Sequence, residues 1–189
     1  MSELKTNLIT PYAGTTVTMG ESGDTVALAA GATATGFGGG KVVQVVNFQT
    51  GAVATGTTAL PNDDTIPQIT EGDEFMTLAI TPTSASNKLK IEVVCSDFSN
   101  TVGTANVTIA LFQDSTAGAL AAWLSSKATA YEISGAFTHF MTAGTTSSTT
   151  FKIRMGCTGG GTTTFNGVSA GRMLGGVLAS SITITEISV

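Results

Sequence analysis

The chain has 189 residues, a net charge of −5 and only 11% charged side chains, against about 25% in an ordinary soluble domain. Its eight Lys and Arg residues are scattered, whereas nucleic-acid binding requires clustered positive charge. Hydrophobic residues, at 42%, exclude wholesale disorder, and no apolar run approaches the roughly 18 residues of a spanning helix. We therefore expect neither a nucleic-acid partner nor membrane insertion.

The N-terminal residues 1–35 differ from the rest of the chain. They contain short β-like pieces at 15–19 and 25–28, separated by glycines, and about thirty such residues cannot bury a core alone. Residues 1–7 have neither the basic nor the apolar region of a signal peptide, so we expect cytoplasmic synthesis. We predict an N-terminal arm, residues 1–35, that docks the protein or strengthens an oligomer through Leu4, Leu8, Ile9, Val17 and Val26. A glycine-rich hinge, residues 36–40, then leads to the main domain.

The main domain, residues 41–189, shows the period-two alternation of β-strands. Phe151, Ile153 and Met155 alternate with Lys152 and Arg154, which places apolar groups on one face of a strand. The same reasoning predicts strands at 41–48, 75–80, 89–96, 107–112, 136–141, 151–155 and 180–187.

The first of these strands is apolar on both faces, as expected in the middle of a sandwich or at a subunit contact. Turn residues cluster between the strands, and residues 117–127 form the one stretch that favours a helical turn. We predict an all-β fold, an antiparallel β-sandwich or jelly-roll-like head behind a short arm. The scarcity of charge suits a chain that is packed against copies of itself.

Several segments resemble tailed-phage virion proteins. Residues 3–11 and 14–20 resemble short repeats in phage fibre shafts. The order of residues 41–46, 78–91 and 180–187 is similar to a β-rich head domain of phage fibre and other virion proteins, particularly in marine phages. The resemblance implies a virion protein that is assembled in the host cytoplasm and works as a homotrimer. Long tail fibres carry extended shafts, whereas this chain has one short arm, which favours a short spike or a capsid-surface fibre.

One motif matches a serine nucleophile. Residues 167–171 read G-x-S-x-G around Ser169, but the base of such a site follows the serine in the chain. The only histidine, His139, lies upstream and shares a strand face with Phe137 and Met141. We therefore predict that Ser169 is not catalytic and that His139 is a core or interface residue.

The acidic residues and the cysteines are the remaining candidates for a chemical site. Asp63–Asp64 and Glu71, Asp73 and Glu74 form two acidic clusters, which we interpret as solvated loops; a glycosidase pair and a hard-cation site are the alternatives. Two cysteines, Cys95 and Cys157, and one histidine are too few and too dispersed for a zinc site, and we interpret Cys95 as a small buried hydrophobe. We predict no catalytic, metal or cofactor site.

Two aromatic residues flank the least strand-like segment of the main domain. Trp123 and Tyr131 lie within the loop of residues 114–131. An aromatic side chain in such a loop can stack on a sugar or contact a neighbouring subunit. Packing within the subunit is the favoured alternative. This loop is our candidate for receptor contact.

Three functional hypotheses follow. The first is a non-enzymatic phage virion component, a short homotrimeric fibre or spike. Its partners would be itself, other virion proteins of the tail or capsid, and a glycan or protein of the host surface. The second is a capsid decoration protein that stabilises the lattice. The third and least favoured is a glycan depolymerase or esterase.

Overall fold

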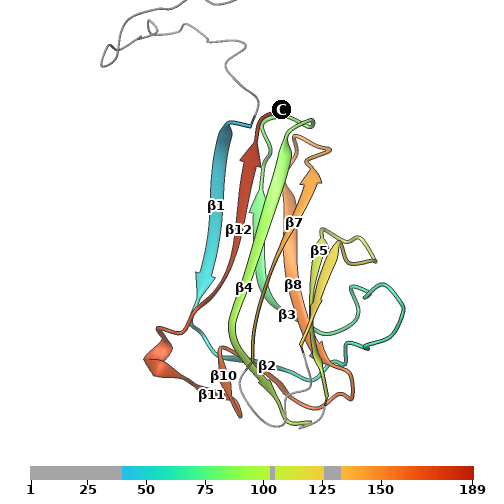
Figure 1. The fold of residues 1–189 in the computed structure, drawn as a ribbon, viewed down its shortest axis with the longest axis vertical. Coiled ribbons are helices and arrows are strands. Elements are labelled where there is room, and N and C mark those ends of the chain that lie inside the picture. Colours follow the sequence, from blue (N-terminus) through green and yellow to red (C-terminus); the bar gives the residue numbers. More distant parts are fainter. Residues whose placement is uncertain (1–39, 103–104, 126–132) are drawn as a thin grey trace, which may run out of the picture. The chain divides into compact units, whose positions relative to one another are not determined.

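Strand β4 is the longest element and organises the larger sheet. We describe the protein from a computed structural model, which covers residues 40–102, 105–125 and 133–189 (Figure 1); these residues belong to the unit Gly39–Val189. The strands are β1 (Val42–Thr50), β2 (Ala54–Gly56), β3 (Asp73–Ile80), β4 (Lys88–Asn100), β5 (Val107–Gln113), β6 (Ala121–Leu124), β7 (Ile133–Thr142), β8 (Thr149–Cys157), β9 (Thr163–Phe165), β10 (Gly167–Val168), β11 (Gly171–Arg172) and β12 (Ser180–Ile187).

Eight of these strands form two facing sheets with jelly-roll connectivity. In the first, which we call the β1–β7 sheet, the order is β1, β12, β4, β7, and every neighbouring pair is antiparallel. In the second, the β3–β6 sheet, the order is β3, β8, β5, β6, again antiparallel. The chain crosses repeatedly from one sheet to the other, so neighbouring strands come from distant parts of the sequence. This two-sheet, eight-strand arrangement is that of a jelly roll.

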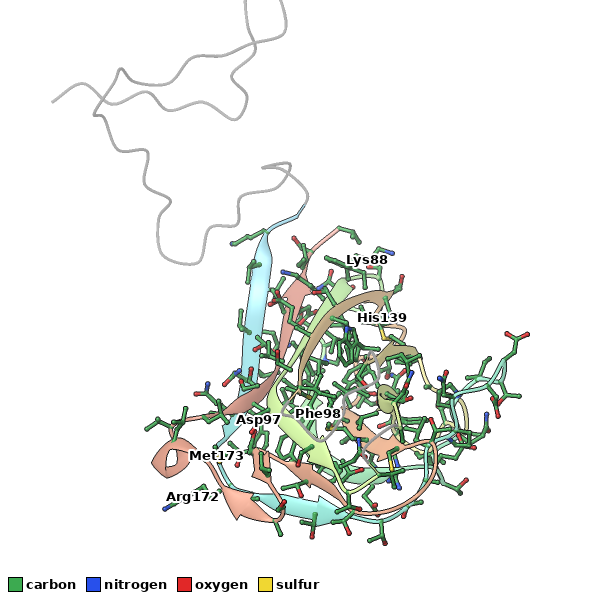
Figure 2. All side chains as sticks on the ribbon, turned by 60° about the horizontal axis from the view of Figure 1, so that its bottom comes forward. Lys88, Asp97, Phe98, His139, Arg172 and Met173 are labelled. Atoms are coloured by element: carbon green, nitrogen blue, oxygen red, sulfur yellow. The ribbon has the colours of Figure 1, made fainter. Side chains whose placement is uncertain are left out.

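The core lies between the two sheets and is made by the inward-facing side of each strand. Strands β4, β8 and β12 alternate between buried and partly exposed residues, as the period of two requires. Phe98 lies in this interior near the end of β4 (Figure 2). Burying one such side chain contributes roughly 1.5–3 kcal/mol. The largest fully buried side chains are those of Phe98, Phe112, Phe151, Phe165, Leu60, Met76, Leu89, Ile91, Ile109, Leu111, Ile153 and Met155.

A loop covers the outer side of the β3–β6 sheet. Leu60 packs against Ala110 and Phe112 of β5, and all three are fully buried. Because the core covers one side of β5 and this loop covers the other, β5 is buried almost throughout.

The end of β4 also pairs with β9, and β9 pairs with β2.

The structure confirms the predicted all-β sandwich and places a strand at each of the seven predicted positions. The predicted helical turn at residues 117–127 is wrong. Ala121–Leu124 forms strand β6 instead, because it pairs with β5 and tertiary pairing overrides weak local propensity. The described residues include no helix that is long and apolar enough to span a membrane. The predicted arm and residues 36–39 of the predicted hinge lie outside the described residues.

Candidate interaction surface

The two edge strands of the β1–β7 sheet carry no formal charge. Neither β1 nor β7 contains Asp, Glu, Lys or Arg, whereas proteins usually protect edge strands with charges, prolines or bulges. The charged residues of this sheet lie on its central strands. They are Lys88, Lys90, Glu92 and Asp97 of β4 and Glu186 of β12.

Strand β1 is an exposed apolar edge. Among the described residues it pairs only with β12, and it lies at the margin of the sheet (Figure 1). The exposed fractions of Val42, Val43, Val45 and Phe48 are 52%, 40%, 56% and 37%. Of the two settings predicted for this strand, the middle of the sandwich is therefore wrong, and a subunit contact stays a prediction.

The opposite edge, β7, exposes one large apolar side chain on the same outer face, among small and hydroxyl side chains. Phe140 is 59% exposed, and Val94 on the adjacent strand β4 is 42% exposed. Cα partners run across the sheet from Val45 to Thr185, then to Lys90 and finally to Phe140. Val45 and Phe140 therefore occupy one row of the sheet, at its two margins and on its outer face.

Between these margins the outer face is threonine-rich and weakly charged. Thr183 and Thr185 of β12 point outward beside an ion pair on β4, in which Lys90 Nζ lies 2.8 Å from Glu92 Oε1. Both side chains of this pair are partly exposed, so it contributes little to stability. The face offers a hydrogen-bonding centre with apolar margins.

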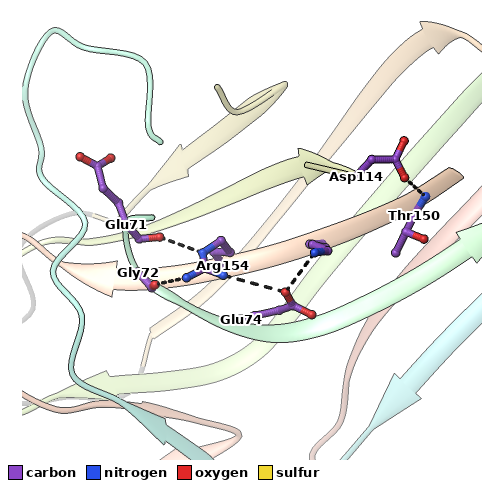
Figure 3. A network of polar contacts seen from close by, with 7 residues as sticks. Glu71, Gly72, Glu74, Asp114, Thr150 and Arg154 are labelled. Atoms are coloured by element: carbon purple, nitrogen blue, oxygen red, sulfur yellow. Dashed lines mark hydrogen bonds and ion pairs between the residues drawn. The ribbon is translucent and has the colours of Figure 1, made fainter. Parts of the chain in front are cut away.

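The outer face of the β3–β6 sheet is different, because charged side chains there bind the loops that lie against it (Figure 3). Arg154 donates hydrogen bonds to the carbonyls of Glu71 and Gly72, at 3.0 and 2.6 Å, and lies 3.9 Å from the Glu74 carboxylate. At the other end of β8, the backbone N–H of Thr150 donates to Asp114 at 2.7 Å. These contacts fix the covering loop and the turn before β8 against the sheet.

A buried carboxylate near the C-terminal end of β12, which the sequence interpretation missed, stabilises that end of the β1–β7 sheet. Glu186 is fully buried; its carboxylate accepts hydrogen bonds from Gln44 (2.6 Å), Asn87 (2.6 Å) and both the backbone N–H and hydroxyl of Thr83 (2.8 Å each). Burial raises the pKa of this carboxyl, but the hydrogen bonds outweigh it and lower the pKa from 4.5 to about 2. The alternation Ile182, Ile184, Glu186 is the signal that could have placed this residue inward.

Ser169 lies in a tight hairpin and not in a strand-to-helix turn. It connects β10 to β11 together with Ala170, and both residues have positive φ, 50° and 63°. Two consecutive positive φ values are typical of a type I′ hairpin. The G-x-S-x-G match therefore lacks the local structure that lifts a serine nucleophile above a sheet.

His139 lies on the inward face of β7, as its alternation with Phe137 and Met141 predicts. Its Cα partner is the buried Ile91, and partial burial lowers the pKa of the imidazole from its ordinary value of 6.5. The described residues contain no group of three or more His, Cys, Asp or Glu side chains that could hold a metal ion. The histidine thus occupies a packing position at the margin of the core.

The acidic clusters have local structural partners. The backbone N–H of Thr65 donates to Asp63 at 2.9 Å, and hydrogen bonds from Thr65 lower the pKa of the Asp63 carboxyl. Asp73 accepts two hydrogen bonds from Thr58, and Glu71 accepts one from the backbone of Gln68. Asp63 and Glu71 lie in the loop before β3, as interpreted, whereas Asp73 and Glu74 are the first residues of strand β3 itself, so the loop interpretation is wrong for that pair.

Of the two aromatic residues predicted to contact a receptor, Trp123 lies in the described part. Its ring packs edge-on against Phe98, with the ring centroids 6.1 Å apart, and is half-buried beside the core. Trp123 also lines a surface hollow of about 190 Å³ between β6 and residues 61–67. Tyr131 lies outside the described residues, as do the predicted arm residues Leu4, Leu8, Ile9, Val17 and Val26.

Both cysteines are free and buried. Burial raises the pKa of the Cys95 thiol to about 12 and also raises the pKa of Cys157. Thiols with raised pKa values are poor nucleophiles. This agrees with the interpretation of Cys95 as a small core residue.

The sequence matches no protein-family model and no curated protein. Among solved structures, it is similar to dimeric latent PorU from Porphyromonas gingivalis, with a TM-score of 0.34 and 8% identity over 81% of this chain and 14% of that one. It is also similar to infectious bursal disease virus, Gx strain (TM-score 0.38, 14% identity, 88% of this chain and 41% of that one). A third similar structure is the VP2 subviral particle of the same virus (TM-score 0.32, 13% identity, 78% and 40%). The chain thus spans less than half the length of each. Because these TM-scores are low, we describe the fold from the strand order of this protein and not from the comparison.

Proposed function

We propose that the protein is a non-enzymatic structural subunit of a phage particle, a short homotrimeric spike whose jelly-roll head is displayed on the virion. The observation that carries this proposal is that both margins of the β1–β7 sheet are uncharged and expose large apolar side chains, four on β1 and Phe140 on β7. An open apolar edge is a template for pairing with another chain. Identical neighbours in a symmetric oligomer are the simplest permanent cover for it.

The described polar groups support a structural role over a catalytic one. Arg154, Asp73, Asp114 and Glu186 are all engaged in hydrogen bonds that fix turns and strands. Ser169 lies in a hairpin and His139 on an inward-facing strand position. In this proposal, the polar side chains stabilise the head that is displayed on the particle.

The mechanism is multivalent display. The arm, residues 1–35, docks the spike to other virion proteins, and three heads on one rigid body each make a weak contact with a host-surface glycan or protein. Linking weak contacts raises their effective concentration, so the whole particle binds more tightly than one head does. Trp123 and Tyr131 remain the candidate contact residues.

The experiment is the mass of the purified full-length protein in solution, measured by light scattering over a wide range of concentration. We expect three times the chain mass at every concentration. A monodisperse single chain at high concentration would contradict the proposal. Antibody labelling of intact particles then distinguishes a tail spike from capsid decoration, and hydrolysis of host-surface glycan by the pure protein would favour an enzyme.

A further inference from the structure

The two uncharged margins of the β1–β7 sheet are complementary to each other. We propose that β1 of one subunit pairs with β7 of the next identical subunit, so that successive β1–β7 sheets join edge to edge in a closed ring. This inference rests on the self-assembly proposed above and names the surface responsible. It differs from a β1-to-β1 contact, which would produce a two-fold dimer.

Strand direction is the first argument. Four strands of this sheet lie side by side in the order β1, β12, β4, β7, and each is antiparallel to the next. An even number of alternating strands makes the two edge strands run in opposite directions. Rotation about an axis along the strands preserves each direction, so β1 of one subunit meets β7 of the next in the antiparallel sense that hairpin-type ladders use.

Register is the second argument. Val45 and Phe140 share a row of the sheet, and where the strands run parallel to the rotation axis, a rotation without translation keeps the rows of neighbouring subunits level. Val45, 56% exposed, then lies beside Phe140 of the next subunit, 59% exposed. Both point to the outer face, where a β-branched residue and an aromatic form a favourable cross-strand pair.

The neighbouring rows contain no electrostatic conflict. Asn47 shares its row with Thr138, and Gln49 shares its row with Ala136. Every pair at the proposed junction is therefore uncharged. The competing margin of the β3–β6 sheet is less suitable, because β3 begins with Asp73 and Glu74 and β6 has four residues.

The size of the junction favours a ring over an open pair. Nine paired residues extend about 30 Å, and one such strand contact buries less than the roughly 800 Å² per partner of a standard interface. In a closed ring each subunit makes two of these contacts. No subunit then retains an open β1 or β7 edge, so closure adds stability and ends growth at these margins.

Charge substitutions test the two margins separately. Val45→Lys and Phe140→Lys each place an ammonium group in the junction. We expect each to raise the protein concentration at which half of the subunits are assembled by about tenfold or more, as measured by light scattering. Ile66→Lys is the matched control, since Ile66 is 63% exposed but lies in the loop before β3. Near-UV circular dichroism checks that each variant is folded.

Disulfide trapping tests the pairing itself and is informative even if a lysine variant fails to fold. Under mild oxidation, we expect Val45→Cys/Phe140→Cys to give covalent trimers on a non-reducing gel. A refolded mixture of the two single variants should give covalent dimers only. Each single variant alone should stay uncrosslinked, because Cys95 and Cys157 are buried.

The outcomes separate this inference from the proposed function. Covalent dimers from Val45→Cys alone would show β1-to-β1 pairing and overturn the inference. A wild-type trimer that is indifferent to Val45→Lys and Phe140→Lys would also overturn it, while self-assembly would stand. A wild-type protein that stays monomeric would overturn both.

Discussion

The carboxylate of Glu186 accepts a 2.6 Å hydrogen bond from the side-chain amide of Asn87, which joins the last strand of the fold to the turn that starts β4. Gln44 donates to the same carboxylate from the edge strand β1. Three segments distant in the sequence therefore converge on one buried anion. We expect this contact to determine whether β1 stays in place.

Glu186→Gln should destabilise the fold by about 2–4 kcal/mol. The new amide replaces an acceptor oxygen with a donor that faces the Asn87 or Gln44 amide, and an unsatisfied buried group is costly. Urea denaturation measures the change. Glu92→Gln is the control, since its carboxylate is partly exposed and forms an ion pair with Lys90. A loss no larger than that of the control would contradict the role given to Glu186.

Stability should fall in acid because of the same group. The pKa of Glu186 is lowered to about 2 in the folded protein, against 4.5 ordinarily. The stabilisation is therefore fully present above pH 4.5 and is lost as the pH falls toward 2; it amounts to about 3 kcal/mol. The measurement is denaturation at a series of pH values. A wild-type pH slope equal to that of Glu186→Gln in this window would contradict the prediction.

Gly135→Ala should disturb the packing of Trp123. A β-carbon at position 135 would lie 2.8 Å from a ring carbon of Trp123 and 2.9 Å from Ile109 Cδ1, and overpacking a core commonly costs about 1–3 kcal/mol. The chain has a single tryptophan, so its fluorescence reports the displacement directly. Ala136→Ser, at the next and outward-facing position, should leave the emission unchanged; an unshifted spectrum in Gly135→Ala would argue against this packing.

Ala170→Gly should stabilise the protein by about 0.5–1 kcal/mol. Ala170 has a φ of 63°, a conformation that glycine adopts without the steric cost of a β-carbon. Thermal denaturation is the measurement. Ala136→Gly, in the extended strand β7, should instead lower the melting temperature. If both substitutions change the melting temperature in the same direction, the hairpin conformation is not the cause.

The alternation of apolar residues was enough to predict the seven main strands, because a sheet with one buried face imposes a period of two. It could not predict which strands pair: Val46 and Ile184 are partners although most of the chain separates them. The short strands β2, β6 and β9 have too few residues to show a pattern, and their pairing depends on the assembled sheets.

The interaction surface was visible only in part. The apolar run at Val42–Thr50 indicated either a buried strand or a subunit contact, and the sheet order was needed to place it at a margin. The relation of Val45 to Phe140 arises from three successive strand registers, which local sequence does not encode. Glu186 was predictable as inward-facing, but its donors come from other segments.

The cover that Leu60 and its loop place over Phe112 and Ala110 has a consequence for contacts with other molecules. Because this loop already fills the outer side of β5, another molecule cannot stack directly on that strand. Any contact on this side of the head is therefore made through the loop itself.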